Sequence, residues 1–181
     1  MVSEVESLPA LALQLGERKR IGVDGTDGVR KTCASAAFAE TLGIPLVSLD
    51  DYLIKNQGGY VQFLRYDELD NALRQSDRFI VEGVCLLQVL ERVAVSVDAH
   101  VYVKRYRHNL WADERELDIA PEDVDDFLAQ ERKFVAMLSG LSGEPAESED
   151  TDPTLADEIV RYHATYRPHE HADYVYRWND G

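Results

Sequence analysis

The stretch that decides the fold occupies residues 25–32 and reads Gly25, Thr26, Asp27, Gly28, Val29, Arg30, Lys31 and Thr32. Residues 20–24 before it are typical of a short buried strand, and residues 31–42 after it predict a helix. A glycine-containing turn between a strand and a helix that opens with Lys-Thr follows the pattern G-x-x-x-x-G-K-[ST]. Backbone N–H groups and the helix start surround a phosphate in such a loop, so we predict phosphate binding here.

Three side chains of this loop carry specific chemistry. Lys31 would neutralise the β- and γ-phosphates of a nucleotide, and Thr32 would supply a hydroxyl to Mg²⁺. Arg30 departs from the pattern, because it stands where the second glycine belongs. Its side chain either turns outward, which predicts weaker ATP binding, or turns inward, pairs with an anion and fills the phosphate site. We favour the outward orientation, because the other residues that a nucleotide site needs are all present.

Strands and helices alternate along the rest of the chain. Further strands are predicted at 45–49, 79–81, 99–103 and 174–176, and further helices at 3–17, 66–75, 84–92, 121–139 and from Asp152-Pro153 onward. The alternation predicts an α/β fold with a parallel five-stranded sheet and helices on both faces. Ligands of such sheets bind beyond the carboxyl ends of the strands, where the glycine-containing loop lies.

Two carboxylates follow predicted strands at this edge. Asp50 is placed to orient or deprotonate an acceptor hydroxyl, and we favour it over Asp51, although a turn or helix-cap role is the alternative. Glu82 ends a strongly apolar strand, where a carboxylate is costly unless it is paired or bound to a metal. Mg²⁺ coordination and a salt bridge to a Lys or Arg are both open for Glu82.

Basic residues end the strand at 99–103. Lys104, Arg105 and Arg107 either begin a lid over residues 104–120 that clamps phosphates, or form an ordinary solvated face.

Histidines and aromatic residues are less informative. His169 and His171 point to a metal only weakly, and a surface turn after Pro168 explains them better. The aromatic rings that could either stack on a nucleobase or pack in the core belong to Tyr52, Tyr60 and Trp111.

Four segments resemble the uridine kinase and phosphoribulokinase group of P-loop kinases, and the resemblance covers nearly the whole chain. They are the loop 25–32, Leu49-Asp50-Asp51-Tyr52-Leu53, Ile80-Val81-Glu82-Gly83-Val84, and residues 162–175 with Tyr166-Arg167-Pro168 and Ala172-Asp173-Tyr174. The resemblance implies a three-layer P-loop NTPase fold. It also implies ATP-dependent phosphorylation of a hydroxyl on a small molecule, perhaps a nucleoside, with Mg²⁺ as the second cofactor.

Our lead hypothesis, which combines these residues with the resemblance, gives individual residues a role. Asp50 and Lys31 would be catalytic; Thr32 and Glu82 would place Mg²⁺; the loop residues, Arg105 and Arg107 would contact the nucleotide. Two other functions stay open: a non-catalytic nucleotide- or anion-binding protein in which Arg30 occupies the phosphate space, and an NTPase in which Asp50 orients water.

Composition limits the partners. The chain has 181 residues, 45% of them hydrophobic, which fits one domain with a substantial core. A net charge of −15 argues against nucleic acid and anionic membranes. Cys33 and Cys85 are expected to be core residues of a cytoplasmic protein, and no signal peptide or transmembrane segment is evident. Residues 140–152 predict a flexible acidic loop.

Overall fold

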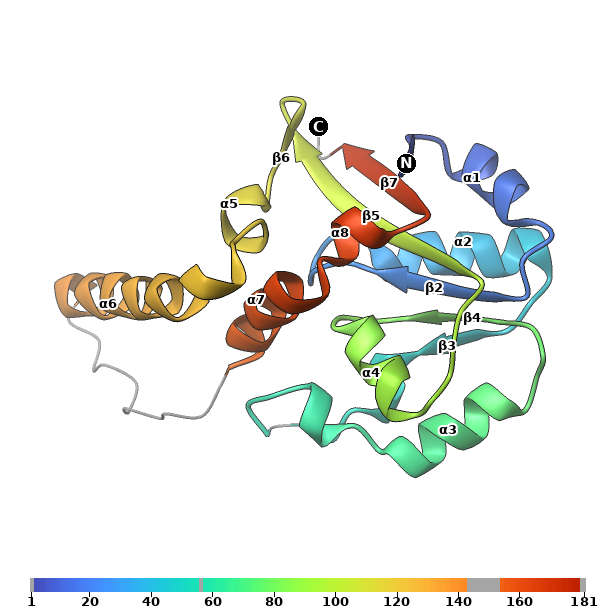
Figure 1. Ribbon diagram of the computed structural model, residues 1–181, viewed down its shortest axis with the longest axis horizontal. Helices are drawn as coiled ribbons and strands as arrows, with labels where there is room; N and C mark the ends of the chain where they lie inside the picture. Colours follow the sequence, from blue (N-terminus) through green and yellow to red (C-terminus); the bar gives the residue numbers. More distant parts are fainter. Residues whose placement is uncertain (1, 56, 143–153, 180–181) are drawn as a thin grey trace.

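The computed structural model describes residues 2–55, 57–142 and 154–179, with a mainly parallel sheet at its centre (Figure 1). The strands are β1 (Ser3–Val5), β2 (Arg20–Asp24), β3 (Leu46–Ser48), β4 (Phe79–Glu82), β5 (Ala99–Arg107), β6 (Leu110–Trp111) and β7 (Tyr174–Asn179). Their order is β1-β7-β5-β2-β4-β3, and β6 adds an antiparallel partner to β5. The predicted parallel α/β sheet is confirmed, but the described residues form seven strands rather than five.

The eight described helices are α1 (Leu8–Leu15), α2 (Lys31–Leu42), α3 (Tyr66–Arg74), α4 (Leu86–Arg92), α5 (Glu114–Leu117), α6 (Val124–Ser142), α7 (Leu155–Tyr166) and α8 (Pro168–His171). Single 3₁₀ turns occupy Leu49–Tyr52, Val61–Phe63 and Pro121–Asp123. None of the described helices combines the length and the apolar composition that crossing a bilayer would require.

The two additional strands have different origins. The predicted helix over 3–17 divides, because Ser7 caps α1 and Pro9 lies in its first turn, while residues 3–5 pair with β7. Strand β6 is a two-residue partner of the end of β5, too short to leave a periodic pattern. Both strands form through contacts with residues distant in sequence or through a hairpin turn, so apolar periodicity alone did not indicate them.

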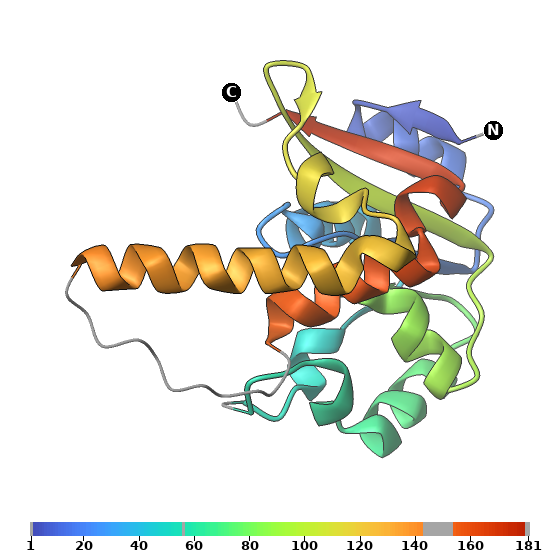
Figure 2. The ribbon, with the colours of Figure 1, turned by 60° about the vertical axis from the view of Figure 1, so that its left-hand side comes forward.

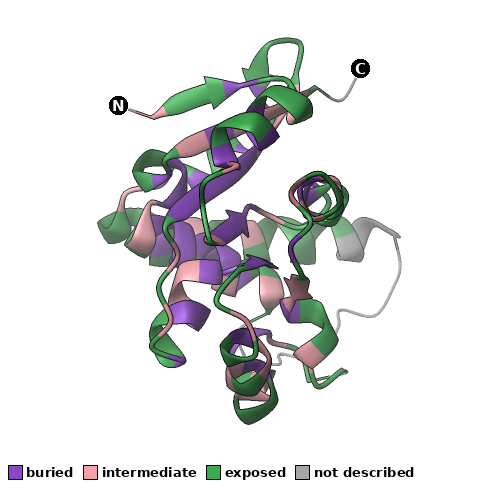
Figure 3. Ribbon diagram, turned by 90° about the vertical axis from the view of Figure 1, so that its right-hand side faces the viewer, coloured by how far each residue is buried: buried purple, intermediate pink, exposed green. Residues whose placement is uncertain are grey.

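Alternation along the central strands sends side chains to two separate cores, and Figure 3 shows the buried residues concentrated on these strands. Ile21 and Val23 of β2 join the core that α1 and α2 cover, which we call the α2 face. Gly22 approaches Leu86 on the opposite side, whose core includes residues of α3, α4 and α7; we call this the α7 face. Asp24 follows Gly22 with the same parity and therefore points to the α7 face.

Helix α6 is only partly supported by the rest of the chain. Val124 and Leu128 pack against α7, but Val135 and Leu138, predicted to lie on the same buried stripe, are 58% and 47% exposed. The second half of the helix projects from the body of the protein (Figure 2), so among the described residues nothing covers this half of the stripe.

Helix α7 begins at Leu155, after Thr154. The Thr154 side chain accepts the N–H of Asp157, and the Asp157 side chain accepts the N–H of Thr154, which forms a capping box. The predicted cap at Asp152-Pro153 and residues 143–152 of the predicted acidic loop lie outside the described residues.

Candidate functional site

The predicted phosphate loop leaves the carboxyl end of β2, the central strand between β4 and β5. Gly25 has a φ of 148°, and a Cβ there would lie 2.9 Å from the carbonyl oxygen of Val103, so a larger residue would collide with the backbone of β5. The Gly25 N–H donates to Asp24 Oδ1 at 2.7 Å, while Val29 is buried in the core of the α2 face. These contacts anchor both sides of the loop.

Exposed polar residues form the top of the loop. The Thr26 hydroxyl donates to the carbonyl oxygen of Asp27 at 3.0 Å, and Asp27 Oδ1 accepts the N–H of Gly28 at 2.8 Å. Asp27 and Gly28 are both exposed, so their backbone can meet a ligand from solvent.

Lys31, the first residue of α2, is buried under this loop. Its Nζ donates to the carbonyl oxygen of Thr26 at 2.5 Å, so the lysine lies inside the curve of the loop. Burial lowers the pKa of Lys31, while the charges of four carboxylates, belonging to Glu82, Asp24, Asp27 and Asp50, oppose that shift. The loop lysine thus stands among carboxylates whose charges outnumber it.

Arg30 has a backbone conformation that favours glycine. Its φ is 61°, in the left-handed region that glycine adopts without a steric cost. Its side chain is exposed, and the guanidinium stacks on the ring of Trp178 in β7 at 4.8 Å. The side chain therefore has the outward orientation.

Glu82 at the end of β4 is 1% exposed and lies on the α2 face. Its Oε1 accepts the Thr32 hydroxyl at 3.2 Å and the Ser48 hydroxyl at 2.6 Å. Three hard oxygen donors from β3, β4 and α2 therefore converge, which is the chemistry that Mg²⁺ prefers. The structure brings Thr32 and Glu82 together as the sequence predicted, and it adds Ser48, which has no distinctive sequence signal.

Asp50 lies in the 3₁₀ turn after β3 and is exposed. Its Oδ1 accepts the hydroxyl of Tyr60 at 2.7 Å. Tyr60 is buried, and burial is the main reason that the pKa of its hydroxyl is raised. The hydrogen bond to Asp50 raises this pKa further, so the hydroxyl stays protonated and remains a donor. Asp51 is also exposed, and its carbonyl oxygen accepts a bond from Arg65 at 2.8 Å. Asp50 therefore has a tyrosine donor that fixes the orientation of its side chain.

Asp24 was not among the predicted site residues, yet it is fully buried beside the loop. Its Oδ2 accepts the hydroxyl of Tyr162 in a short hydrogen bond and lies 3.5 Å from His100 Nε2. A carboxylate at the last position of a buried strand is the signal that could have identified it, because such a group needs donors around it.

The basic residues at the end of β5 already have partners within the fold. Lys104 Nζ lies 4.0 Å from the centre of the Trp111 ring, and burial lowers the pKa of this lysine. Arg105 forms a close ion pair with Asp113. Lys104, Arg105 and Arg107 all belong to β5, and Arg107 is exposed opposite Leu110 of β6. A lid function would require Lys104 and Arg105 to exchange their present partners.

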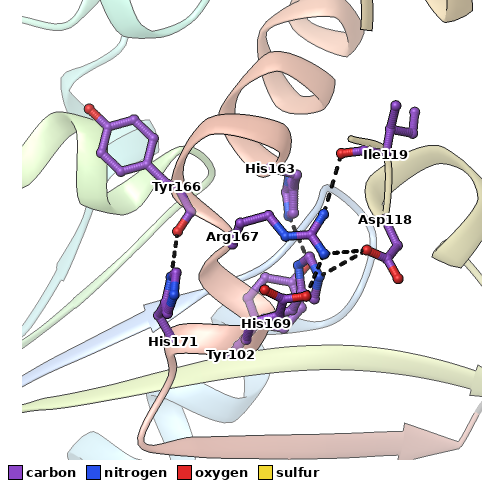
Figure 4. Close-up of polar contacts among 9 residues, drawn as sticks. Tyr102, Asp118, Ile119, His163, Tyr166, Arg167, His169 and His171 are labelled. Carbon is purple, nitrogen blue, oxygen red and sulfur yellow. Dashed lines mark hydrogen bonds and ion pairs between the residues drawn. The ribbon is translucent and has the colours of Figure 1, made fainter. Parts of the chain in front are cut away.

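A polar cluster joins α8 to the segment before α6 (Figure 4). Potential ligand atoms of Asp118, His169 and Glu170 lie within 4.8 Å of one another. The guanidinium of Arg167 pairs with both carboxylates and donates to the carbonyl oxygen of Ile119 at 3.3 Å. The cation of this cluster is therefore an arginine.

Two predictions about individual side chains are wrong, and one alternative that the sequence left open is decided. His169 is 5% exposed and packs against Trp111, so the surface turn expected after Pro168 is instead a short, partly buried helix. Cys33 is exposed, because the third residue of α2 faces away from the sheet. Trp111 and Tyr60 are buried, which makes core packing rather than base stacking their role in this structure.

No family model matches the sequence, and no curated protein matches it. Among solved structures, the chain is similar to a protein described as a possible uridine kinase from Bacillus stearothermophilus, with a TM-score of 0.52, 14% identity, and coverage of 93% of this chain and 96% of that one.

Two further solved structures are more distant. A protein named as a fructose transport system kinase from Silicibacter sp. TM1040 matches with a TM-score of 0.46, 14% identity and coverage of 95% and 100%. Shikimate kinase from Bacteroides thetaiotaomicron matches with a TM-score of 0.43, 16% identity and coverage of 88% and 86%. The first likeness confirms that this chain shares the α/β fold of that possible uridine kinase.

Proposed function

We propose that the protein is an ATP- and Mg²⁺-dependent kinase that phosphorylates a hydroxyl group of a small molecule. The observation that carries this proposal is the placement of Lys31 inside a loop at the end of the central strand. The negative charges of Glu82 and Asp50 favour the protonated form of this lysine, against the effect of burial. The predicted phosphate loop, Glu82 and Asp50 thus lie at one edge of the sheet, and this arrangement supports the proposal.

In this proposal the loop N–H groups and Lys31 bind the β- and γ-phosphates. Thr32, Glu82 and Ser48 would hold Mg²⁺ through their oxygen atoms, and the ion would supply positive charge that offsets the charge of the phosphates. The need for a divalent cation follows from the electrostatics, because a triphosphate would otherwise enter a site where four carboxylates surround one lysine.

Asp50 orients or deprotonates the acceptor hydroxyl, and Tyr60 holds it in place by its hydrogen bond. Two arginines already donate hydrogen bonds to the backbone of the segment that carries Asp50 and Tyr60. Arg65 donates to the carbonyl oxygens of Asp51 and Leu53, and Arg92 donates to the carbonyl oxygen of Val61. An acceptor that carries its own phosphate would compete for those cations, so a nucleoside or another uncharged hydroxyl compound fits this side better.

A thermal-shift experiment tests nucleotide binding directly. We expect Mg·ATP to raise the melting temperature of the wild type and Lys31→Ala to lose most of that increase, because ligands stabilise the state that binds them. Lys19→Ala is the matched control, since Lys19 is exposed before the opposite end of β2. An unchanged melting temperature with millimolar nucleotide would reject the proposed function.

ADP release measured with a panel of nucleosides and sugars then tests catalysis. Nucleotide binding without ADP release from any acceptor would favour the non-catalytic alternative.

A further inference from the structure

Two side chains of helix α7, one helical turn apart, contact two separate segments. One contact is to Asp24, the residue before the phosphate loop, and the other is to residues 60–61, which we call the acceptor segment because Tyr60 holds Asp50. Glu158 Oε2 accepts the N–H groups of Tyr60 at 2.9 Å and Val61 at 3.1 Å. The Tyr162 hydroxyl donates to Asp24 Oδ2 and accepts the N–H of Leu87 at 3.2 Å. Residues four apart lie on the same face of a helix, so one surface of α7 holds both segments.

Each contact leads in one further step to a group that the proposed function places in the chemistry. Tyr60, held by Glu158, donates its hydroxyl to Asp50. Asp24, held by Tyr162, accepts the N–H of Gly25, where the phosphate loop begins. The base and the phosphate loop are therefore connected through α7 by hydrogen bonds, although they lie on separate segments.

The helix itself is well fixed. Its first turn is closed by the capping box of Thr154 and Asp157, and Asp157 also pairs with Arg132 of α6 at 2.6 Å. In the middle of the helix His163 is buried, and its Nε2 lies 2.7 Å from the Tyr102 hydroxyl of β5. A helix anchored on the sheet and on α6 can hold two loops in a constant relation.

We propose that Glu158 and Tyr162 are positioning residues that keep Asp50 and the phosphate loop in register for phosphoryl transfer. Their role in the reaction rests on the proposed function, whereas the connection between the two segments through α7 does not. Nucleotide binding that orders the phosphate loop should also order the amides of Tyr60 and Val61, although these amides belong to the acceptor segment.

Amide hydrogen exchange with Mg·ADP as the probe tests this connection. In the wild type we expect Mg·ADP to slow exchange in residues 25–32 and also at Tyr60 and Val61. In Tyr162→Phe the loop should still be slowed at saturating Mg·ADP, but the effect on Tyr60 and Val61 should disappear. Without nucleotide, Gly25 should exchange roughly tenfold faster in this variant, since its acceptor Asp24 loses a strong donor.

The helix offers a matched control one turn further on. Tyr166→Phe also removes one hydroxyl, which in the native protein donates to the exposed Glu91 at 2.5 Å. This variant should behave like the wild type in both regions. Equal behaviour of Tyr162→Phe and Tyr166→Phe would overturn the proposal.

Glu158 provides a rescue experiment. Glu158→Ala should speed exchange of Tyr60 and Val61 by about tenfold or more without nucleotide, because both N–H groups lose their charged acceptor. Glu158→Gln should restore part of the protection, since an amide oxygen can accept the same two bonds. If Gln is no better than Ala, or Ala changes nothing, Glu158 is not a positioning residue.

The two hypotheses fail in different ways. If Mg·ADP slows no amide in residues 25–32 of any variant, the nucleotide function is wrong, and the nucleotide-free comparisons of Tyr162→Phe and Glu158→Ala still decide whether α7 holds the two segments. If the loop is slowed but Tyr60 and Val61 are not in the wild type, the function stands and the connection is rejected.

Discussion

The carboxylates that end β2 and β4 differ in what surrounds them, although both are almost completely buried. Glu82 points to the α2 face, where two hydroxyl groups, from Thr32 and Ser48, donate to one of its oxygens. Asp24 points to the α7 face, where a backbone N–H and the phenol of Tyr162 occupy separate oxygens. Hydroxyl groups can rotate and bind a cation with their lone pairs, whereas an N–H cannot.

We expect the α2 face to bind the metal and the α7 face to position the loop and Asp50. The α2 face can offer Glu82, Thr32 and Ser48 to Mg²⁺ without breaking a backbone bond. On the α7 face Asp24 is committed to the start of the loop, and Tyr60 and Glu158 support Asp50. We therefore expect substitutions on the α2 face to change metal and nucleotide dependence, and substitutions on the α7 face to change alignment and stability.

The largest effect is expected at Asp50. Asp50→Asn should keep nucleotide binding but lower phosphoryl transfer by roughly 10²-fold or more, the scale of general base catalysis. Asp51→Asn should do less, because in the described part of the chain the tyrosine hydroxyl donates to Asp50 and not to Asp51. The measurement is ADP release with the nucleoside of the panel that gives the fastest reaction; a larger loss in Asp51→Asn would reverse the assignment.

Mg²⁺ titrations separate the two buried carboxylates. Glu82→Gln should raise the Mg²⁺ concentration needed for half-maximal ATP binding by roughly tenfold, because second- and first-sphere carboxylates typically contribute that much. Asp24→Asn should leave the Mg²⁺ requirement in place and lower the free energy of unfolding in urea by about 1–3 kcal/mol, since it weakens buried hydrogen bonds of a charged group. Similar Mg²⁺ dependence in both variants would remove the distinction between the faces.

Acid should destabilise the α7 face first, because burial favours the neutral form of two of its histidines, His163 and His169, in the folded protein. Burial, aided by the charge of Lys104, lowers the pKa of His169 to about 4, and burial also lowers that of His163. The unfolded chain has a histidine pKa of about 6.5, so between these values it binds more protons and the free energy of unfolding falls as pH falls.

Urea unfolding at pH 7 and pH 5 measures this loss. We expect His169→Phe, which keeps an aromatic ring against Trp111, to lose less stability than the wild type over this interval. The control is His171→Gln at an exposed position, which should follow the wild type. An equal loss in all three proteins would show that His169 does not contribute.

The smallest effect is expected at Arg30. Arg30→Gly should bind Mg·ATP a few-fold more tightly in calorimetry, because it removes a side chain beside the phosphates and suits the left-handed backbone. Stability should change by less than about 1 kcal/mol, since relief of the left-handed strain offsets loss of the stacking on Trp178. Trp178→Ala loses the stacking but keeps the strained backbone of Arg30, so it should be less stable than the wild type. Weaker binding by Arg30→Gly would make Arg30 a phosphate ligand.

The parallel α/β sheet was predictable from the chain because local patterns carry it. The strand at 20–24, the loop glycines and the helix at 31–42 all follow from apolar spacing and turn chemistry within a few residues. Thr32 and Glu82 were likewise predicted to share a site, since the carboxyl ends of neighbouring parallel strands meet at one edge.

Tertiary structure decided the remainder, because those features depend on residues far apart in sequence. Strand β1 exists through its pairing with β7, and the second half of α6 projects although its apolar stripe predicted burial. Tyr162 meets Asp24 across 138 residues, and Glu158 meets Tyr60 across 98. Apolar spacing shows that a side chain needs burial, but only the packed chain brings to a buried carboxylate the donors that satisfy it.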